Sequence, residues 1–308
     1  MADATKIVVM AGATGRLGMM TARILLERPG VQLRLLARPE STEKLSALQA
    51  KGAEVVAIDL EAPDNDALLA QAMQDAFCVV STIGAQAGPD VMIGTQLRLL
   101  QAARDAGVRR FIPSCFSYDI SGLEQGENLN SDILRAFLHA AQQVRGDVEL
   151  VQIQIGAYAD PAILFGFLGA FDLAAGEAFL WGDGNARMDF TTYLDTARFT
   201  AEAAIDDAVL PDILQFAGDS LTFHELVQAY EAGSGKSIAV QQLGTMADLD
   251  DEIGRRMQAE PQNFFAWLPL MYWRAMLSGK VALQSIGNDR YPHVKPMSMA
   301  DYVREAGL

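Results

Sequence analysis

Residues 6–18 read Lys6-Ile7-Val8-Val9-Met10-Ala11-Gly12-Ala13-Thr14-Gly15-Arg16-Leu17-Gly18. The apolar run 6–10 predicts a buried β-strand, and a pattern with helical period starts at Arg16. The glycines have the spacing Gly-x-x-Gly-x-x-Gly. A strand that leads into a helix through a short glycine-rich turn predicts the first β-α unit of a parallel sheet.

The same alternation continues through the first half of the chain. Apolar runs that predict strands lie at 6–10, 32–37, 54–58, 77–82, 110–114 and 149–155. Segments with helical period separate them at 16–27, 42–50, 64–74, 90–106 and 130–144. Apolar strands separated by helices predict a parallel sheet covered on both faces. Because crossovers between parallel strands are right-handed, we expect a Rossmann-type, doubly wound α/β fold.

The alternation ends after residue 157. Residues 158–187 are rich in Phe and Gly and predict loops and short helical pieces, whereas 197–205, 213–217 and 223–232 predict a helix, a strand and a helix. From about 241 onward we expect helices, with an aromatic helical stretch at 264–273 broken near Pro269. We therefore predict a Rossmann domain of residues 1–157, to which 188–240 return, and a smaller C-terminal substrate region. That substrate region comprises 158–187 and 241–308.

The glycine loop predicts a dinucleotide site. Gly12 permits a tight turn, Gly15 allows backbone to approach a pyrophosphate, and Gly18 lets the helix pack on the strand. The helix N-terminus supplies N–H groups and the positive end of a dipole. The glycines could instead serve a purely structural turn. Their spacing also differs from the usual dinucleotide-binding fingerprint, Gly-x-Gly-x-x-Gly. The candidate contacts in this loop are Gly12, Thr14, Gly15, Arg16, Leu17 and Gly18.

The end of the second strand favours NADP(H) over NAD(H). An NAD site usually carries an acidic residue there, about 20 residues beyond the loop, for the ribose 2′-hydroxyl. This chain has Ala37-Arg38-Pro39 instead. A guanidinium suits a 2′-phosphate because it donates hydrogen bonds in a planar fork, and Arg16 lies in the facing loop. The alternative is that Arg38 is a solvated residue at a strand end.

Ligands of open α/β sheets lie beyond the carboxyl ends of the strands, which gives further candidates. We expect the residues after the third strand to border adenine, and those after the fourth and fifth strands to approach the cofactor. Tyr158, after the sixth strand, is expected near the nicotinamide. The remaining cofactor candidates are Asp59, Leu60, Thr82, Ile83, Gly84, Ser114, Cys115 and Phe116.

The composition narrows the possible partners. The chain has 308 residues and a formal net charge of -15, which disfavours nucleic acids and anionic membranes. The longest apolar run, 161–171, is too short to span a bilayer, and no secretory signal is visible. Two cysteines, Cys78 and Cys115, and three scattered histidines give no zinc spacing. We expect reduced thiols, no metal and a cytoplasmic protein, with a homodimer or a regulatory protein partner left open.

The chain resembles the NmrA-like and isoflavone-reductase-like branch of the atypical short-chain dehydrogenases. The resemblance rests on the glycine loop, on 96–103 leading into 106–114, on Asp195-Thr196-Ala197, on 221–235 and on Tyr291-Pro292-His293-Val294-Lys295. It implies a Rossmann fold, a preference for NADP(H) and a C-terminal region that closes over the nicotinamide.

The chain departs from that resemblance at the lysine. Short-chain dehydrogenases use Tyr-x-x-x-Lys, and isoflavone-reductase-like enzymes carry a lysine early in the helix after the fifth strand. This chain has no lysine between Lys51 and Lys236, and Asn130 lies near the expected position. If a protein proton donor is needed, the candidates are Tyr118 and Tyr158, with Cys115 third. Each tyrosine could instead be a pocket wall.

Three functions remain open from the sequence. The first is a reductase of a conjugated or aromatic acceptor, a quinone, enone or iminium-like molecule, which spreads the incoming charge. The second is an NADP(H)-binding sensor that acts on a protein, and the third is a structural protein with a vestigial pocket. Aromatic residues that could wall a pocket for a flat substrate favour the reductase, although they could equally form a core or an interface. They are Phe165, Phe167, Phe171, Phe179, Trp181, Phe264, Phe265, Trp267, Tyr272 and Trp273.

Overall fold

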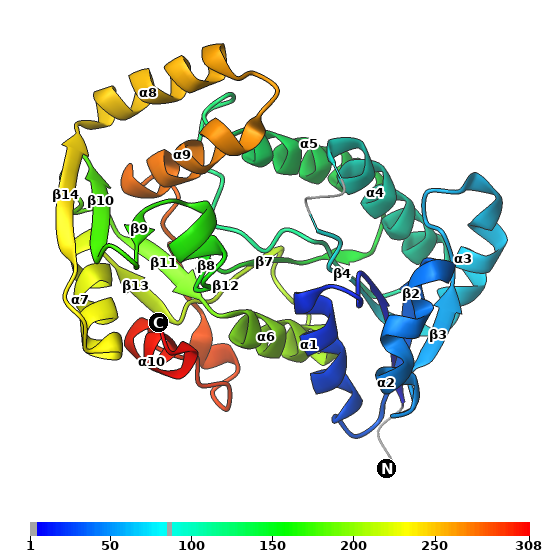
Figure 1. Cartoon of the computed structure of the whole chain (residues 1–308). Helices are drawn as coiled ribbons and strands as arrows, with labels where there is room; N and C mark the ends of the chain where they lie inside the picture. Colours follow the sequence, from blue (N-terminus) through cyan, green and yellow to red (C-terminus); the bar gives the residue numbers. More distant parts are fainter. Residues whose placement is uncertain (1–4, 85–87) are drawn as a thin grey trace. The chain divides into compact units, whose positions relative to one another are not determined.

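The computed structural model describes residues 5–84 and 88–308, which fold as two compact units (Figure 1). The first unit comprises Met1–Phe116, Ile133–Ile153 and Thr196–Leu214. The second unit comprises Ser117–Asp132, Gln154–Asp195 and Gln215–Leu308. Each unit is therefore assembled from three separate stretches of chain.

The described residues of the first unit form a six-stranded parallel sheet in the order β3-β2-β1-β4-β5-β6. This order is that of the doubly wound dinucleotide-binding fold, so the predicted fold class is confirmed. The strands are β1 (Lys6–Ala11), β2 (Val31–Ala37), β3 (Glu54–Ala57), β4 (Ala76–Ser81), β5 (Arg110–Ile112) and β6 (Glu149–Leu150).

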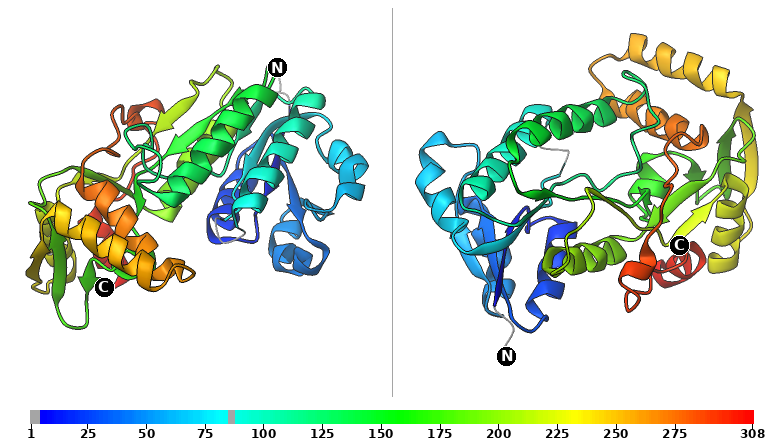
Figure 2. Two further views of the ribbon diagram at one scale, coloured as in Figure 1. Left: turned by 90° about the horizontal axis from the view of Figure 1, so that it is seen from above. Right: turned by 180° about the vertical axis from the view of Figure 1, so that it is seen from behind.

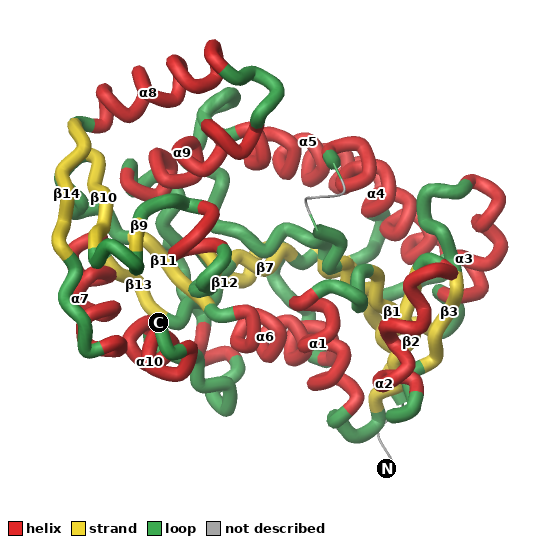
Figure 3. Tube along the Cα trace, viewed as in Figure 1, coloured by secondary structure: helices red, strands yellow, loops and turns green. Residues whose placement is uncertain are grey.

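Helices cover both faces of this sheet (Figures 1 and 3). One face packs against α3, α4 and α5 through a core that includes Val79, Leu99 and Phe137. The opposite face carries α1 and α2. The helices are α1 (Arg16–Leu26), η1 (Pro39–Leu45), α2 (Ser46–Gln49), η2 (Pro63–Asn65), α3 (Asp66–Ala72), α4 (Pro89–Asp105), α5 (Leu129–Val144) and α6 (Tyr193–Ile205).

The second unit contains small sheets and further helices (Figure 2). Its described residues form two three-stranded sheets, in the orders β14-β10-β9 and β13-β11-β8. Strand β12 pairs with β7 where the chain passes from one unit to the other. Strands β7 (Gln152–Gln154) and β12 (Ile213–Gln215) each have two residues in the first unit and one in the second. The strands within the second unit are β8 (Ala157–Tyr158), β9 (Phe171–Asp172), β10 (Glu177–Trp181), β11 (Met188–Thr191), β13 (Asp219–Leu221) and β14 (Ala239–Gly244). The helices are η4 (Ile163–Phe167), α7 (Phe223–Ser234), α8 (Met246–Ala259), α9 (Phe264–Leu277), η5 (Asn288–Arg290) and α10 (Met299–Ala306).

Four local predictions were wrong. The strand predicted at 149–155 is divided into β6 and β7. Strands β10 and β14 occupy segments that were predicted as loops and helices, and β14 lacks an apolar alternation because five of its six residues are exposed. Helix α9 continues through Pro269, whose missing N–H removes only the bond to the carbonyl of Phe265.

The compact units differ from the predicted division of the chain. Residues 117–132, 154–157, 188–195 and 215–240 lie in the second unit rather than with the Rossmann sheet. The reason is that β8, β11 and β13 pair with one another, while α7 packs against α10. The role of the second unit as a substrate region remains a prediction.

A buried arginine joins the last strands of the first unit to the end of α6. The Arg110 side chain is fully buried on β5. Its Nε and Nη2 donate to a Glu149 carboxylate oxygen at 2.9 and 2.6 Å. Nη1 donates to the carbonyls of Ala203 and Asp206, and Nη2 also donates to that of Ala208, at 2.6–2.8 Å. All five N–H groups of the guanidinium are therefore used, which is what permits burial of the charge.

We expect Arg110→Met to destabilise the protein by about 3–5 kcal/mol, because it leaves Glu149 Oε2 and three carbonyls without their donor. Urea denaturation followed by circular dichroism measures this loss. Arg145→Ala is the matched control, since the Arg145–Asp212 pair is long, at 3.5 Å, and more exposed. It should cost about 1 kcal/mol or less. Equal losses in the two variants would contradict the role given to Arg110.

Candidate functional site

The glycine loop is held against the end of β4 by a close backbone contact. The N–H and hydroxyl of Thr82 both donate to the Ala11 carbonyl, at 2.9 and 3.0 Å. A Cβ on Gly12 would lie 2.6 Å from the Thr82 carbonyl, and one on Gly18 would lie 2.4 Å from the Gly12 oxygen. Gly12 also has a φ of +87°. Both positions therefore require glycine. Gly12 requires it because of its positive φ and its contact with Thr82, and Gly18 because α1 packs against the turn that follows β1.

The middle of the loop is open. Thr14, Gly15 and Arg16 are exposed, whereas Leu17 is buried. Gly15 is the N-cap of α1 and provides no side-chain acceptor for the first turn. The N–H groups at this helix start are thus without a side-chain cap and can receive the oxygens of a phosphate. This is the arrangement that a pyrophosphate needs.

Arg38 follows the last residue of β2 and is accessible. Its side chain is 63% exposed, and its ion pair with the exposed Glu40 is long, at 3.9 Å. Such a pair contributes little and does not hold the guanidinium in place. Arg38 can therefore turn toward a ligand.

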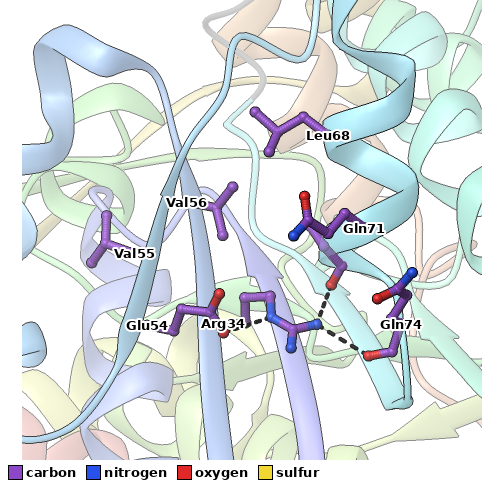
Figure 4. Close-up of a pocket in the computed structure, with 8 residues that line it drawn as sticks. Arg34, Glu54, Val55, Val56, Leu68, Gln71 and Gln74 are labelled. Atoms are coloured by element: carbon purple, nitrogen blue, oxygen red, sulfur yellow. Dashed lines mark hydrogen bonds and ion pairs between the residues drawn. The ribbon is translucent and has the colours of Figure 1, made fainter.

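Arg34, four residues earlier on β2, is fixed instead (Figure 4). It pairs with Glu54 at 2.8 Å and donates to the carbonyls of Ala72 and Gln74 at the end of α3. These residues, with Val56 and Leu68, line a hollow of about 280 Å³ beside β3. Because its arginine is already bonded to Glu54 and to two carbonyls, we assign this hollow a structural role.

The other predicted cofactor positions lie at the ends of the remaining strands. The Ser114 hydroxyl donates to the Ile83 carbonyl at 2.8 Å, and its N–H donates to Gln96 at 2.6 Å, so the segments after β4 and β5 are joined. Gly84 is exposed, and Phe116 is half-buried. After β3, Asp59 accepts from the Glu61 N–H, and Leu60 packs against the core. Contact of these residues with a cofactor stays a prediction.

The cysteines are buried and weakly acidic. Burial raises the pKa of both Cys78 and Cys115 to about 12. A thiol with so high a pKa is a poor proton donor and holds little of its reactive thiolate form. This disfavours Cys115 as the third candidate for a donor.

The two candidate tyrosines lie in the second unit and differ in their surroundings. Tyr118 is 4% exposed, its hydroxyl lies 3.2 Å from that of Ser131, and burial strongly raises its pKa. Tyr158 is half-buried and stacks on Tyr193, with ring centroids 3.9 Å apart. Neither contact tests the catalytic role, which stays a prediction.

One polar pair was not predicted. The amide of Asn130, at the start of α5, donates to the hydroxyl of Tyr272 on α9 at 2.9 Å. Asn130 was singled out only as the residue near the lysine position, and Tyr272 only as part of an aromatic stretch. The two are 142 residues apart, so no local pattern could have connected them.

Residues 5–84 and 88–308 contain no group of three or more His, Cys, Asp or Glu side chains that could hold a metal ion. None of the helices in the same residues combines the length and apolar character needed to cross a bilayer.

The fold and the glycine loop agree with the comparison to known families. The NmrA-like family model matches residues 4–267, so the chain belongs to the NmrA-like family. The predicted family is confirmed.

Individual relatives are more distant. The phenylcoumaran benzylic ether reductase PT1 of Pinus taeda is 26% identical over 247 residues, which are 75% of this chain and 76% of the relative. The structure of AtPrR2 with NADP+ and (+)pinoresinol has a TM-score of 0.81 at 21% identity and covers 100% of both chains. The Citrobacter sp. triphenylmethane reductase complexed with NADP(H) has a TM-score of 0.71 at 20% identity and covers 98% of this chain and 100% of the other. At these identities the solved structures show a shared fold.

We expect both thiols of the native protein to resist Ellman's reagent at pH 8, because a pKa near 12 leaves only about one thiolate in 10⁴ molecules. The same protein in urea should react rapidly at two thiols per chain. Rapid labelling of one native thiol, assigned with Cys115→Ser, would contradict the burial described above.

Proposed function

We propose that this protein is an NADPH-dependent reductase of a flat, conjugated or aromatic small molecule. The observation that carries the proposal is the glycine loop, whose uncapped helix start and exposed Arg38 suit a dinucleotide with an additional phosphate. Membership of the NmrA-like family supports it.

The cofactor is NADP(H). Gly12, Gly15 and Gly18 bring backbone close to the pyrophosphate, Arg38 pairs with the 2′-phosphate, and the residues after β4 and β5 flank the nicotinamide half. Two related folds named above are solved with NADP+ or NADP(H), which supports the choice of the phosphorylated cofactor.

A reductase is favoured over a sensor of redox state. The relatives include reductases of a phenylcoumaran benzylic ether and of triphenylmethane compounds. NADPH, when bound, supplies a hydride, so the protein has to orient the acceptor, exclude water and, for some acceptors, provide a proton. We keep Tyr118 and Tyr158 as proposed donors.

The acceptor is proposed to be a quinone, an enone or an iminium-like cation. Aromatic side chains of the second unit gather around Tyr272: Tyr118 and Phe167 lie 5.8 and 5.9 Å from its ring. Aromatic rings of this kind bind flat ligands by stacking and edge contacts. The aromatic ligands named for the relatives are consistent with such a site.

We expect Arg38→Ala to weaken binding of NADPH and NADP+ by about 10- to 100-fold, because one charge-assisted phosphate contact is lost. Binding of NADH and NAD+ should not change. Isothermal titration calorimetry with the four nucleotides measures both effects. Arg23→Ala on the exposed side of α1 is the control and should leave all four affinities unchanged. An equal loss for phosphorylated and unphosphorylated cofactors would contradict the role of Arg38.

We also expect the purified protein to oxidise NADPH in the presence of quinones, aromatic enones or cationic dyes. The loss of NADPH absorbance reports turnover, and chromatography of the reduced acceptor confirms it. Gly18→Ala is the control for site integrity, because its Cβ would collide with the Gly12 oxygen and displace the loop. It should abolish both turnover and nucleotide binding. Absence of turnover across all three acceptor classes, with unequal affinities for NADPH and NADP+, would favour the sensor.

A further inference from the structure

The start of α5 fixes the position of an amide donor. Asn128 caps this helix, since its Oδ1 accepts from the Ser131 N–H at 3.0 Å. The cap fixes the first turn, on which Asn130 lies. The Asn130 amide then donates to the Tyr272 hydroxyl at 2.9 Å.

Charged contacts tie the end of α9 and the residues after it to Glu127, just before α5, and to Asp250 on α8. Arg274 pairs with Glu127 at 3.0 Å and with Asp250 at 2.6 Å, and Lys280 pairs with Glu127 at 2.7 Å. Burial acts to raise the pKa of Glu127, but the hydrogen bond from Lys280 and the nearby cations lower it overall. Glu127 therefore stays ionised at neutral pH. Tyr272, two residues before Arg274, is thus held in a defined place.

The hydrogen bond from Asn130 determines what the Tyr272 hydroxyl can do. Its oxygen accepts from the amide, so its own hydrogen points elsewhere, and among residues 5–84 and 88–308 it finds no acceptor. Tyr118 differs, because its hydroxyl contacts Ser131, which itself donates to Asn128. The Tyr118 hydrogen is therefore taken up by Ser131, whereas that of Tyr272 is available.

The surroundings of Tyr272 suit an aromatic ligand. The ring of Phe167 packs edge-on against Tyr272 and lies 6.4 Å from that of Phe265, which is 78% exposed. Phe167 closes a π-helical turn, η4, in which its N–H donates to the Ala162 carbonyl five residues earlier. Such turns are frequent at functional sites. Tyr272, a half-buried residue, thus lies beside aromatic rings, one of which is largely exposed.

We propose that Tyr272 is the group that donates to the carbonyl oxygen of an aromatic enone, and that Asn130 positions it. This inference rests on the reductase function proposed above. The β-carbon of the enone accepts the hydride of NADPH, and the C=C electrons move to form an enolate. The enolate oxygen takes the proton of Tyr272, whose phenolate then regains a proton from water. Cationic acceptors become neutral on accepting a hydride and need no such donor.

Binding tests this role without turnover. In the NADP+-loaded protein, benzylideneacetone is compared by calorimetry with 1-phenyl-1-butene, which has the same carbon skeleton but no carbonyl oxygen. Tyr272→Phe should weaken benzylideneacetone about 5- to 10-fold, as expected for one lost hydrogen bond, and leave the hydrocarbon unchanged. Asn130→Leu should have a smaller effect in the same direction. Tyr230→Phe is the control, because the buried Tyr230 hydroxyl has no partner within the described part of the chain.

Turnover adds a readout that a structural defect would not reproduce. Tyr272→Phe should lower kcat for benzylideneacetone by about 10²-fold or more, and leave the reduction of malachite green, a carbocation dye, unchanged. Equal losses with enone and dye, or no loss with either, would overturn the proposal. A loss of enone reduction alone in Tyr118→Phe, with none in Tyr272→Phe, would also overturn it. The same holds if the wild-type protein binds the enone no better than the hydrocarbon. If the wild type reduces no acceptor, the reductase function fails, and the binding comparison alone decides on Tyr272.

Discussion

The arrangement of the candidate nucleotide site depends on the contact between the ends of β1 and β4. The Ala11 carbonyl accepts both hydrogens that Thr82 can offer, and this draws the two strand ends so close that Gly12 and Gly18 have no room for a side chain. Helix α1 must then start directly above the edge of the sheet. Because parallel strands end at one edge of the sheet, Arg38 after β2 and Ser114 after β5 lie at the same edge as the start of α1.

Features encoded locally could be predicted from the sequence. The apolar runs fixed the strands of the first unit to within a few residues, since buried parallel strands have a continuous apolar signal. Strand β14 has no such signal because it is an exposed edge strand, and β10 was obscured by the surrounding Phe and Gly residues. The glycine loop was found by its spacing. The Asn130–Tyr272 pair was not, because it forms between helices distant in the chain.

Helix α9 is mostly apolar, yet it also carries polar groups that form specific contacts. Most of its side chains are apolar, and Trp267, Met271 and Trp273 are buried in the second unit. The same helix carries Arg274, which pairs with Glu127 just before α5 and with Asp250 on α8, and the Tyr272 hydroxyl, which accepts from Asn130 at the start of α5. The contacts of Arg274 and of the Tyr272 oxygen form in only one rotational orientation of so apolar a helix, so they specify how α9 packs.

The buried Arg110 has a consequence for the order in which the protein can fold during synthesis. The strand that carries it is complete by residue 112, but its acceptors lie at Glu149 and at Ala203, Asp206 and Ala208. Until those residues have left the ribosome, the sheet would bury a cation with no counter-charge and no carbonyls to receive its hydrogens. The first 112 residues, although they hold five of the six strands of the parallel sheet, must therefore wait as an incomplete intermediate for nearly a hundred further residues.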